Sequence, residues 1–537
     1  MERNAKFNYK IVIASIKERF YIYGFVTVKV EIIFNRANFF HKFKQTKKSI
    51  SGYFMNFLST VLLAVTVTFS ASVNNSSPDR YDEKYRPQYH FTPEKNWHND
   101  PNGLVYYDGE YHMFYQYNPN GTEWGYMHWG HAVSKDLVHW EHLPIALYPD
   151  ENSTDKEHCT AFSGSAVVDE NNILGKQKGE TKTLVAFYTS QHCGQRIAYS
   201  TDKGRTWEKY ENNPIIPYYE NDDARDPKVF WYEPSKKWVM VLYRKLNEND
   251  NSKGVSIYTS DNMLDWEWKS HIPGFFECPD LVKFKVSNRP EETVWVLFDG
   301  DGSYVIGDFD GETFTPSSGK MKSDWGKNYY ATQTWSNIPA EDGRILQIAW
   351  MRDGKFPDMP FNGQMTFPSE LSVKKFPVGY KLIRKPVSEI EQLYDKHYDW
   401  SDKNLIPGLN KNLVKSVSGD CLRIVGEFDL KTCDNFGFMV RHSNKNAGAE
   451  ILYNVKRGVL TVLGSTVPLL PVDNKIKLDI LLDRASIEIY ANDGEAVVSN
   501  CFTPEEKADD IVLYSNGGEL EVIQLDVYKI QSIYTDK

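Results

Sequence analysis

A short motif recurs along the middle of this sequence and constrains its fold more than any other feature. A serine ends a strand-like run, an aspartate sits in the following turn and a tryptophan begins the next run, at 134–140, 200–207 and 260–266. A weaker copy follows at 307–314. The copies recur every roughly 50–65 residues, the length of a four-stranded β-propeller blade with its loops. We therefore expect a propeller over residues 85–385.

The rest of the chain also reads as strands and turns. Aromatic and β-branched runs, such as 111–117 and 238–243, are bounded by Gly, Asn, Asp and Pro, and helical periodicity is scarce. The repeats fade after residue 385, and 386–409 is a polar stretch that we interpret as a linker. Alternating strands resume over 410–537, where Asn492-Asp493-Gly494 is a strong hairpin signal. We predict an all-β protein in which the propeller is followed by a β-sandwich domain.

Three carboxylates stand in proline-containing motifs at the edges of strand-like segments. They are Asp100 in Asn99-Asp100-Pro101, Asp226 in Arg225-Asp226-Pro227 and Glu277 in Glu277-Cys278-Pro279. One such motif alone is more often a turn than a site. In a propeller, however, the ends of the innermost strands gather around one axial mouth, so all three carboxylates can meet there. Hydrolysis of a glycosidic bond requires two carboxyl groups.

The charge distribution favours a neutral substrate. The formal net charge is −10, of which residues 1–54 contribute 11 − 3 = +8, so the remainder carries −10 − 8 = −18. An acidic body disfavours nucleic acid and anionic membranes as partners. His128 and His131 have no Cys or His partners at metal-ligand spacing, so we interpret them as structural histidines and expect neither a metal nor a cofactor.

The N-terminus carries signals for export. Residues 1–54 form a basic extension that fits no domain pattern, and 55–72 join an apolar run to small residues ending at Ser72. Such a run is typical of a secretory signal peptide and short for a membrane span. We expect Met55 to act as the working start, cleavage near Ser72, and an extracellular mature protein without a membrane partner. The alternative is an uncleaved signal anchor that holds the protein at the membrane.

Two further features agree with export. Cys159 and Cys193 fall in the second repeat and are the candidate disulfide pair if the chain is exported. Sequons for N-linked glycosylation occur at four positions: Asn74, Asn75, Asn120 and Asn152.

From about Tyr89 to the C-terminus the chain resembles glycoside hydrolase family 32, the invertases, exo-inulinases and levanases. The resemblance rests on several motifs in family order: Trp97-His98-Asn99-Asp100-Pro101-Asn102-Gly103, Gln116-Tyr117-Asn118-Pro119, Trp124-Gly125, Phe162-Ser163-Gly164-Ser165, Arg225-Asp226-Pro227, Glu277-Cys278-Pro279-Asp280, Tyr329-Tyr330-Ala331-Thr332-Gln333 and Asp483-Arg484-Ala485-Ser486-Ile487-Glu488. The family fold is a five-bladed β-propeller followed by a β-sandwich. One departure is His98, where many members have Met.

The resemblance implies a role for each of these carboxylates. Asp100 would be the nucleophile, Glu277 the general acid/base and Asp226 a stabiliser of the transition state, in a retaining mechanism. The residues that would surround the fructosyl unit, besides Asp226 and Glu277, are Asn99, Asn102, Gln116, Trp124, Phe162, Ser163, Arg225 and Trp350.

The implied activity is that of a cofactor-free β-fructofuranosidase. It would release terminal non-reducing β-D-fructofuranosyl units, from sucrose first and from inulin or levan second. Alternatives are an exo-inulinase or levanase acting mainly on fructan polymers, and a fructosyltransferase. A propeller that only binds carbohydrate usually lacks one of the carboxylates, and all three are present here.

Overall fold

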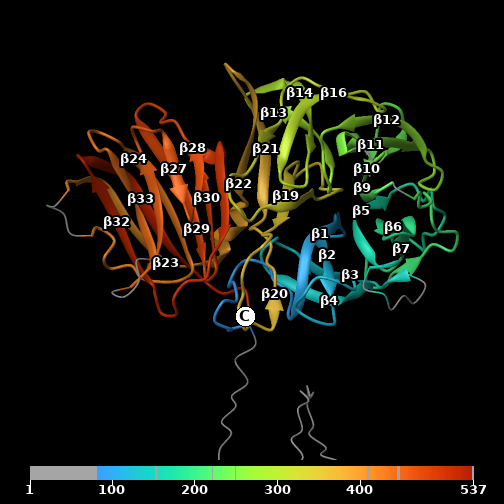
Figure 1. Cartoon of the computed structure of the whole chain (residues 1–537), viewed down its shortest axis with the longest axis horizontal. Helices are drawn as coiled ribbons and strands as arrows, with labels where there is room; N and C mark the ends of the chain where they lie inside the picture. The colour runs from blue at the N-terminus through green and yellow to red at the C-terminus, as the bar shows by residue number, and fades with distance from the viewer. Residues whose placement is uncertain are drawn as a thin grey trace, which may run out of the picture. The chain divides into compact units, whose positions relative to one another are not determined.

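A computed structural model describes residues 81–534, except 151–154, 156, 221, 248–249, 408–411 and 444–447 (Figure 1). The basic extension, the hydrophobic segment 55–72 and the sequons at Asn74, Asn75 and Asn152 lie outside the described residues. No helix in the described part of the chain is long and apolar enough to cross a membrane.

The predicted propeller is present and has five blades. The first three lie in separate sheets, and β13–β19, β21 and β22 form a larger sheet that contains the fourth and fifth. Blade 1 comprises β1 (Asn96–Tyr107), β2 (Glu110–Asn118), β3 (His128–Ser134) and β4 (Trp140–Leu147), with β20 (Phe361–Asn362) added in parallel to β1. Blade 2 comprises β5 (Ala161–Asp169), β6 (Thr183–Ser190), β7 (Gly194–Ser200) and β8 (Glu208–Lys209). Blade 3 comprises β9 (Arg225–Tyr232), β10 (Lys237–Lys245), β11 (Lys253–Ser260) and β12 (Glu267–Pro273).

The last two blades are joined by one parallel residue pair between β13 and β21. Blade 4 comprises β13 (Asp280–Val286), β14 (Arg289–Phe298), β15 (Ser303–Phe309), β16 (Phe314–Pro316) and β17 (Met321–Lys322). Blade 5 comprises β18 (Tyr330–Thr334), β19 (Ile345–Trp350), β21 (Ser369–Phe376) and β22 (Gly379–Pro386).

The recurring sequence motif forms the turn after the third strand of a blade. After β7, Asp202 accepts hydrogen bonds from the hydroxyl of Ser200 at 2.7 Å and the backbone N–H of Thr206 at 2.9 Å. The Trp207 indole then donates to the Gly204 carbonyl at 3.0 Å, which closes the turn. After β11 the accepting side chain is Asn262 rather than the neighbouring aspartate, because the turn needs a short side-chain oxygen at that position and not a charge.

The C-terminal part is a two-sheet sandwich. One sheet has the order β23-β33-β24-β29-β30-β31 and the other β28-β27-β26-β25-β32. The bounds of the first sheet are β23 (Tyr394–Leu405), β24 (Leu422–Asp429), β29 (Lys475–Asp483), β30 (Ser486–Ala491), β31 (Ala496–Cys501) and β33 (Leu520–Ile530). Those of the second are β25 (Asn435–His442), β26 (Ala449–Asn454), β27 (Val459–Val462), β28 (Ser465–Pro468) and β32 (Asp510–Asn516). Apolar side chains of both sheets form one core.

Most of the segment predicted as a linker, 386–409, has regular secondary structure instead. It contains the 3₁₀ helix η3 (Ser388–Leu393) and then β23, which pairs with β33 along most of its length. Most of the side chains of β23 are exposed because it is the edge strand of the sheet. One face of β23 is solvated and the other carries the half-buried aromatics Tyr394, Tyr398 and Trp400, so most of its residues are polar and the sequence pattern was misleading.

Candidate active site

Residues at the start of the innermost strands line one cavity of about 230 Å³. Each blade begins with its innermost strand, and β1, β5, β9, β13 and β18 all present their N-terminal ends to this cavity. The lining residues are Asn99, Asp100, Gln116, Trp124, Phe162, Ser163, Arg225, Asp226, Glu277, Tyr330, Trp350 and Arg352. The structure therefore brings together every predicted catalytic or substrate-binding residue except Asn102, although they span 252 positions from Asn99 to Trp350.

Asn102 lies fully buried beneath the cavity and holds two of its lining residues. With its amide oriented to match its neighbours, it donates to Ser163 Oγ at 3.3 Å and accepts from Gln116 Nε2 at 3.0 Å. Its structural task is to position Ser163 and Gln116 rather than to contact a ligand.

Asp100 is held by donors on both carboxylate oxygens. Ser163 Oγ donates to Oδ2 at 2.6 Å, and Asn99 Nδ2 donates to Oδ1 at 3.1 Å. Burial raises the pKa of Asp100, Ser163 lowers it through its hydrogen bond, and the negative charge of Glu277 raises it further; the net shift is upward. The Cys278 thiol lies 3.6 Å from Asp100 Oδ2 and 3.6 Å from Asp226 Oδ2, between the two carboxylates.

Asp226 is buried at the start of β9 with a left-handed backbone, φ +64°. Its carboxylate accepts the Cys278 backbone N–H at 3.0 Å, and its own N–H donates to Thr189 Oγ1 at 3.0 Å. Burial raises its pKa to about 7, with the charge of Arg225 opposing and those of Glu277 and Asp100 reinforcing the rise. Glu277 (φ +56°) and Cys278 (φ +41°) are also left-handed, and such conformations of non-glycine residues cluster at functional sites.

Glu277 receives hydrogen bonds from two different blades. Arg225 donates from Nε at 3.1 Å and Nη2 at 2.8 Å, both to Glu277 Oε1. The Tyr330 hydroxyl donates to Glu277 Oε2. Arg225 also pairs with Asp223, so this one guanidinium offsets several of the surrounding negative charges.

Tyr330 and Arg352 line the cavity but were not predicted as site residues. The Arg352 guanidinium lies over the Tyr330 ring, 4.4 Å from its centroid. Tyr330 stands in one of the motifs that carry the family resemblance, and its place there was the available signal. Arg352 follows β19 in a loop and has no comparable signal in the sequence.

A larger cavity of about 760 Å³ adjoins the first and shares Trp124, Phe162, Arg225 and Glu277 with it. Its remaining walls come from blade 2, from Lys245 at the end of β10, and from the segment before blade 3, which includes the exposed aromatics Tyr218 and Tyr219. We call it the outer groove.

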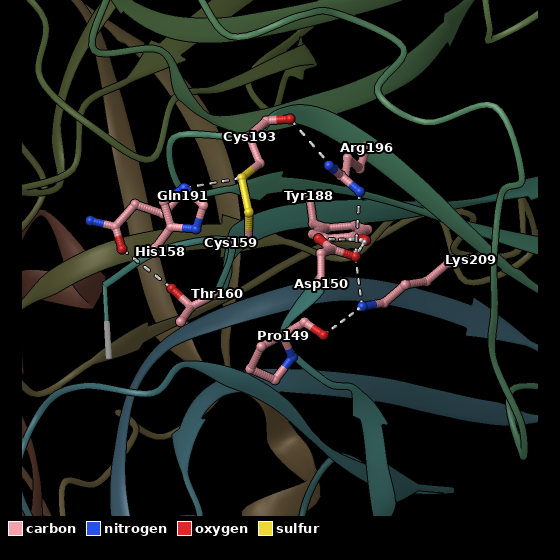
Figure 2. Close-up of a disulfide and its surroundings, with 10 residues drawn as sticks. All are labelled: Pro149, Asp150, His158, Cys159, Thr160, Tyr188, Gln191, Cys193, Arg196 and Lys209. Atoms are coloured by element: carbon pink, nitrogen blue, oxygen red, sulfur yellow. Dashed lines mark hydrogen bonds and ion pairs between the residues drawn. A yellow bond between two sulfur atoms is a disulfide. The ribbon is translucent and has the colours of Figure 1, made fainter. Parts of the chain in front are cut away.

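A disulfide joins Cys159 to Cys193 (Figure 2), beside residues that line the outer groove. Gln191, His192 and Gly194, on either side of Cys193, line the groove. Nearby, buried Asp150 accepts a hydrogen bond from the Tyr188 hydroxyl at 3.0 Å and pairs with Lys209 at 2.6 Å. These bonds tie Asp150 to strands β6 and β8 of blade 2.

His128 and His131, the two histidines considered in the sequence, have different hydrogen-bond partners. His131 pairs with His112 at 3.1 Å, and His128 contacts the Tyr126 carbonyl. In the described residues the one His/Cys/Asp/Glu group close enough to bind a metal consists of His158 and the two disulfide cysteines, which have no thiolate to offer.

His98, the departure from the family pattern, is buried outside the cavity. It stacks on Phe91 at a centroid distance of 6.0 Å, and burial lowers its pKa to about 3. A neutral ring at this depth replaces an apolar side chain in packing and adds no charge to the site.

Comparisons with known proteins agree with this arrangement. The family models for the glycosyl hydrolases family 32 N-terminal and C-terminal domains match residues 90–386 and 389–529. A levanase of Bacillus subtilis is 41% identical over 517 residues, covering 88% of this chain and 74% of the levanase. An extracellular exo-inulinase of Aspergillus awamori is 33% identical over 533 residues, covering 84% of this chain and 96% of the relative.

The chain is also similar in fold to solved structures. The crystal structure of an Aspergillus awamori exo-inulinase matches with a TM-score of 0.77 and 32% identity, covering 84% of this chain and 100% of the other. A Schwanniomyces occidentalis fructofuranosidase complexed with fructosylnystose matches with a TM-score of 0.75 and 26% identity, covering 86% and 100%.

Proposed function

Since this chain belongs to glycosyl hydrolase family 32 and is a hydrolase that releases fructose from a carbohydrate substrate, we propose that it removes terminal non-reducing β-D-fructofuranosyl units from fructans and from sucrose with retention of configuration. The observation that carries the proposal is that Asp100, Asp226 and Glu277, from three different blades, line one cavity of about 230 Å³.

In the proposed reaction Asp100 forms the covalent bond and Glu277 transfers the protons. Asp100 attacks the anomeric carbon of the fructosyl unit while the bond to the leaving oxygen breaks and Glu277 gives that oxygen its proton. Water then attacks the fructosyl–Asp100 ester, Glu277 takes a proton from the water, and Asp100 leaves as the carboxylate. Ser163 and Asn99 donate hydrogen bonds to Asp100, which favours the ionised form that attack requires.

Other lining groups suit the binding of a fructosyl ring. Asp226, held in place by the Cys278 N–H, is assigned to hydrogen bonds with ring hydroxyls that strengthen as positive charge develops on the sugar. Trp350 lines the cavity and is assigned to its apolar wall. Trp124 and Phe162 supply apolar surface at the entrance to the outer groove.

The outer groove favours substrates longer than a disaccharide. It has more than three times the volume of the inner cavity, 760 Å³ against 230 Å³, and begins at Glu277, where the leaving group departs. Relatives named levanase and exo-inulinase point the same way. We therefore rank fructans above sucrose, the reverse of the order inferred from the sequence.

The test is a product profile on sucrose, inulin and levan. We expect free fructose as the first product of both polymers, released in the β-anomeric form before mutarotation, and equal amounts of glucose and fructose from sucrose. Oligosaccharides as first products would contradict exo-cleavage, and initial release of the α-anomer would contradict retention. A deficit of fructose relative to glucose would identify the fructosyltransferase alternative.

Tyr330→Phe tests the role assigned to the second partner of Glu277. Loss of the hydroxyl removes one of the hydrogen bonds that position the Glu277 carboxyl, so we expect kcat/KM for sucrose to fall about tenfold, or ~1.4 kcal/mol of barrier. Tyr329→Phe is the matched control, since the adjacent Tyr329 hydroxyl donates to Gln347 and lies outside the cavity. Equal kinetics for both variants would remove Tyr330 from the mechanism.

We further infer that the protein acts outside the cell. Asn120, the described sequon, is exposed, and a disulfide suits an oxidising compartment. Relatives include proteins named extracellular exo-inulinase. The intact mass of the secreted product tests this: a chain starting near residue 73 is expected, and retention of residues 1–54 would refute cleavage and favour the anchored alternative.

A further inference from the structure

The turn between β6 and β7 forms part of the wall of the outer groove. His192 in this turn lines the groove together with Tyr218, which belongs to the segment before blade 3. The two rings pack edge-on, with centroids 5.5 Å apart and an angle of 89° between the ring planes. Two separate segments of the chain therefore form one surface, and we call this pair of rings the aromatic wall.

The backbones of the two segments are also in direct contact. Gly194 has φ +89°, and a Cβ at this position would lie 2.4 Å from the Ile216 carbonyl oxygen and 2.9 Å from the Tyr218 nitrogen. The next residue, Gln195, donates its N–H to the Ile216 carbonyl at 2.8 Å. Only glycine permits so close an approach, so the turn sets the position of the segment that carries Tyr218.

The disulfide attaches this turn to a strand that lines the catalytic cavity. Cys193 belongs to the turn, and its partner Cys159 lies two residues before β5, the strand that carries Phe162 (Figure 2). Two backbone hydrogen bonds accompany the disulfide: the Cys159 N–H donates to the Gln191 carbonyl at 2.8 Å, and the Gln191 N–H donates to the Thr160 carbonyl at 3.2 Å. The aromatic wall is therefore held in a fixed position relative to the catalytic cavity.

The position of the aromatic wall indicates which part of a substrate reaches it. Glu277, which gives the leaving oxygen its proton in the proposed reaction, lines both cavities. The aromatic wall lines only the outer groove, so it lies farther from the bond that breaks. When the terminal fructosyl unit occupies the inner cavity, the rest of the substrate extends into the groove. Sucrose has one further unit to place there, whereas a fructan has many.

Exposed rings in fixed positions suit contact with sugars. His192 is exposed and Tyr218 is 43% exposed. A tyrosine offers an apolar face to the C–H face of a sugar ring and a hydroxyl group to its oxygens. Because the two rings already pack against each other, little side-chain freedom is lost when a sugar binds.

We propose that the aromatic wall determines specificity for long substrates, by contacting fructan units beyond the one next to the scissile bond, and that the disulfide holds it in place. This inference rests on the proposed function, which supplies a fructosyl chain as the substrate. Loss of the aromatic wall is then expected to weaken the binding of fructans more than the binding of sucrose.

Tyr218→Ala tests the aromatic wall through the kinetics of inulin and sucrose hydrolysis. We expect KM for inulin to rise about tenfold with little change in kcat, because the lost contact is made equally in the ground state and in the transition state. KM for sucrose is expected to rise about twofold, so the ratio of kcat/KM for inulin to kcat/KM for sucrose falls about fivefold. Tyr218→Phe keeps the ring and should preserve most of this ratio.

Tyr148→Ala is the matched control. Tyr148 is 56% exposed and also packs edge-on against a histidine, His128, with centroids 5.3 Å apart and an angle of 76° between the rings, but it lines neither cavity. Its loss is expected to leave the inulin-to-sucrose ratio unchanged. An equal fall of the ratio in both variants would overturn the proposal, since any exposed tyrosine would then have the same effect.

The double substitution Cys159→Ser and Cys193→Ser tests the role of the disulfide. Its loss is expected to lower the inulin-to-sucrose ratio in the wild-type background and to change it little in the Tyr218→Ala background, where the ring is already absent. Equal effects in the two backgrounds would show that the disulfide does not act through the aromatic wall. Because Tyr218 is exposed, Tyr218→Ala decides the proposal on its own if the double variant does not fold.

An inulin-to-sucrose ratio for Tyr218→Ala within about twofold of the wild-type value, with unchanged thermal stability, would overturn the proposal. Fructose release by the wild-type protein is assayed in parallel. Normal release with an unchanged ratio in Tyr218→Ala rejects the aromatic wall alone, whereas no release from sucrose, inulin or levan rejects the proposed function.

Discussion

Asp100→Asn is expected to lower kcat for both sucrose and fructan by about 10⁴-fold, equivalent to ~5.5 kcal/mol of barrier. Asparagine keeps the shape of the side chain and can still accept from Ser163, so the fold and the cavity should survive. It cannot form the covalent ester, because a neutral amide is a far weaker nucleophile than a carboxylate. Removal of a covalent nucleophile commonly has effects of this size or larger.

The measurement is initial fructose release at saturating substrate. Asp265→Asn is the control, since Asp265 is an exposed aspartate in the turn between β11 and β12 and lies outside the cavity. Activity of Asp100→Asn within tenfold of the wild type would be incompatible with a nucleophilic Asp100, because tenfold is only ~1.4 kcal/mol.

The three carboxylates could be predicted from sequence because each stands in a rigid, proline-containing motif. Their meeting place followed from the repeat, since blades of equal size put the starts of their first strands at one axis. Local chemistry and repeat length were both visible in the chain. The geometry that joins Asp100, Asp226 and Glu277 therefore required no knowledge of individual contacts.

Other features depend on contacts that a sequence does not display. Tyr330 reads as an ordinary strand aromatic, and only its hydroxyl's position opposite Glu277 separates it from core tyrosines. The strand β23 has the composition of a linker because one of its faces is solvated and the other is only half-buried.

One motif found in the sequence acquires its physical explanation from the fold. Asp483 and Glu488 are the first and last residues of the motif 483–488. They bind opposite nitrogens of His90, which lies in the segment before β1. The distances are 2.8 Å from His90 Nδ1 to Asp483 and 2.9 Å from Nε2 to Glu488, and all three side chains are fully buried. Asp483 also accepts the backbone N–H groups of Gln88 and Tyr89. The motif therefore joins the sandwich to the segment that leads into the first blade.

Protonation of His90 links this junction to pH. Burial lowers the pKa of His90, but the hydrogen bonds and charges of Asp483 and Glu488 outweigh it and raise the pKa from 6.5 to about 9. Its contribution to stability is therefore complete below pH 6.5 and is lost as the pH rises through 9. Burial raises the pKa values of Asp483 and Glu488, but the hydrogen bonds to His90 outweigh it and lower both pKa values. The stability that these two carboxyls contribute is therefore present above their ordinary pKa values of 3.8 and 4.5, and it is lost as the pH falls below those values.

His90→Gln is expected to lower the free energy of unfolding by about 3–5 kcal/mol at pH 6, because it removes the cation that pairs with two buried carboxylates and leaves only the charge of Arg384 near Glu488. His397→Gln is the matched control: it breaks a His–Asp pair with Asp526 whose histidine is 46% exposed, and exposed pairs contribute about 0–1 kcal/mol. Denaturant unfolding of both variants and the wild type, at pH 6 and pH 10, measures the effect. The deficit of His90→Gln should shrink at pH 10, where the wild-type histidine has also lost its charge. A deficit below 1 kcal/mol at pH 6, or one that does not change with pH, would show that the junction is held by its apolar contacts and not by this buried ion cluster.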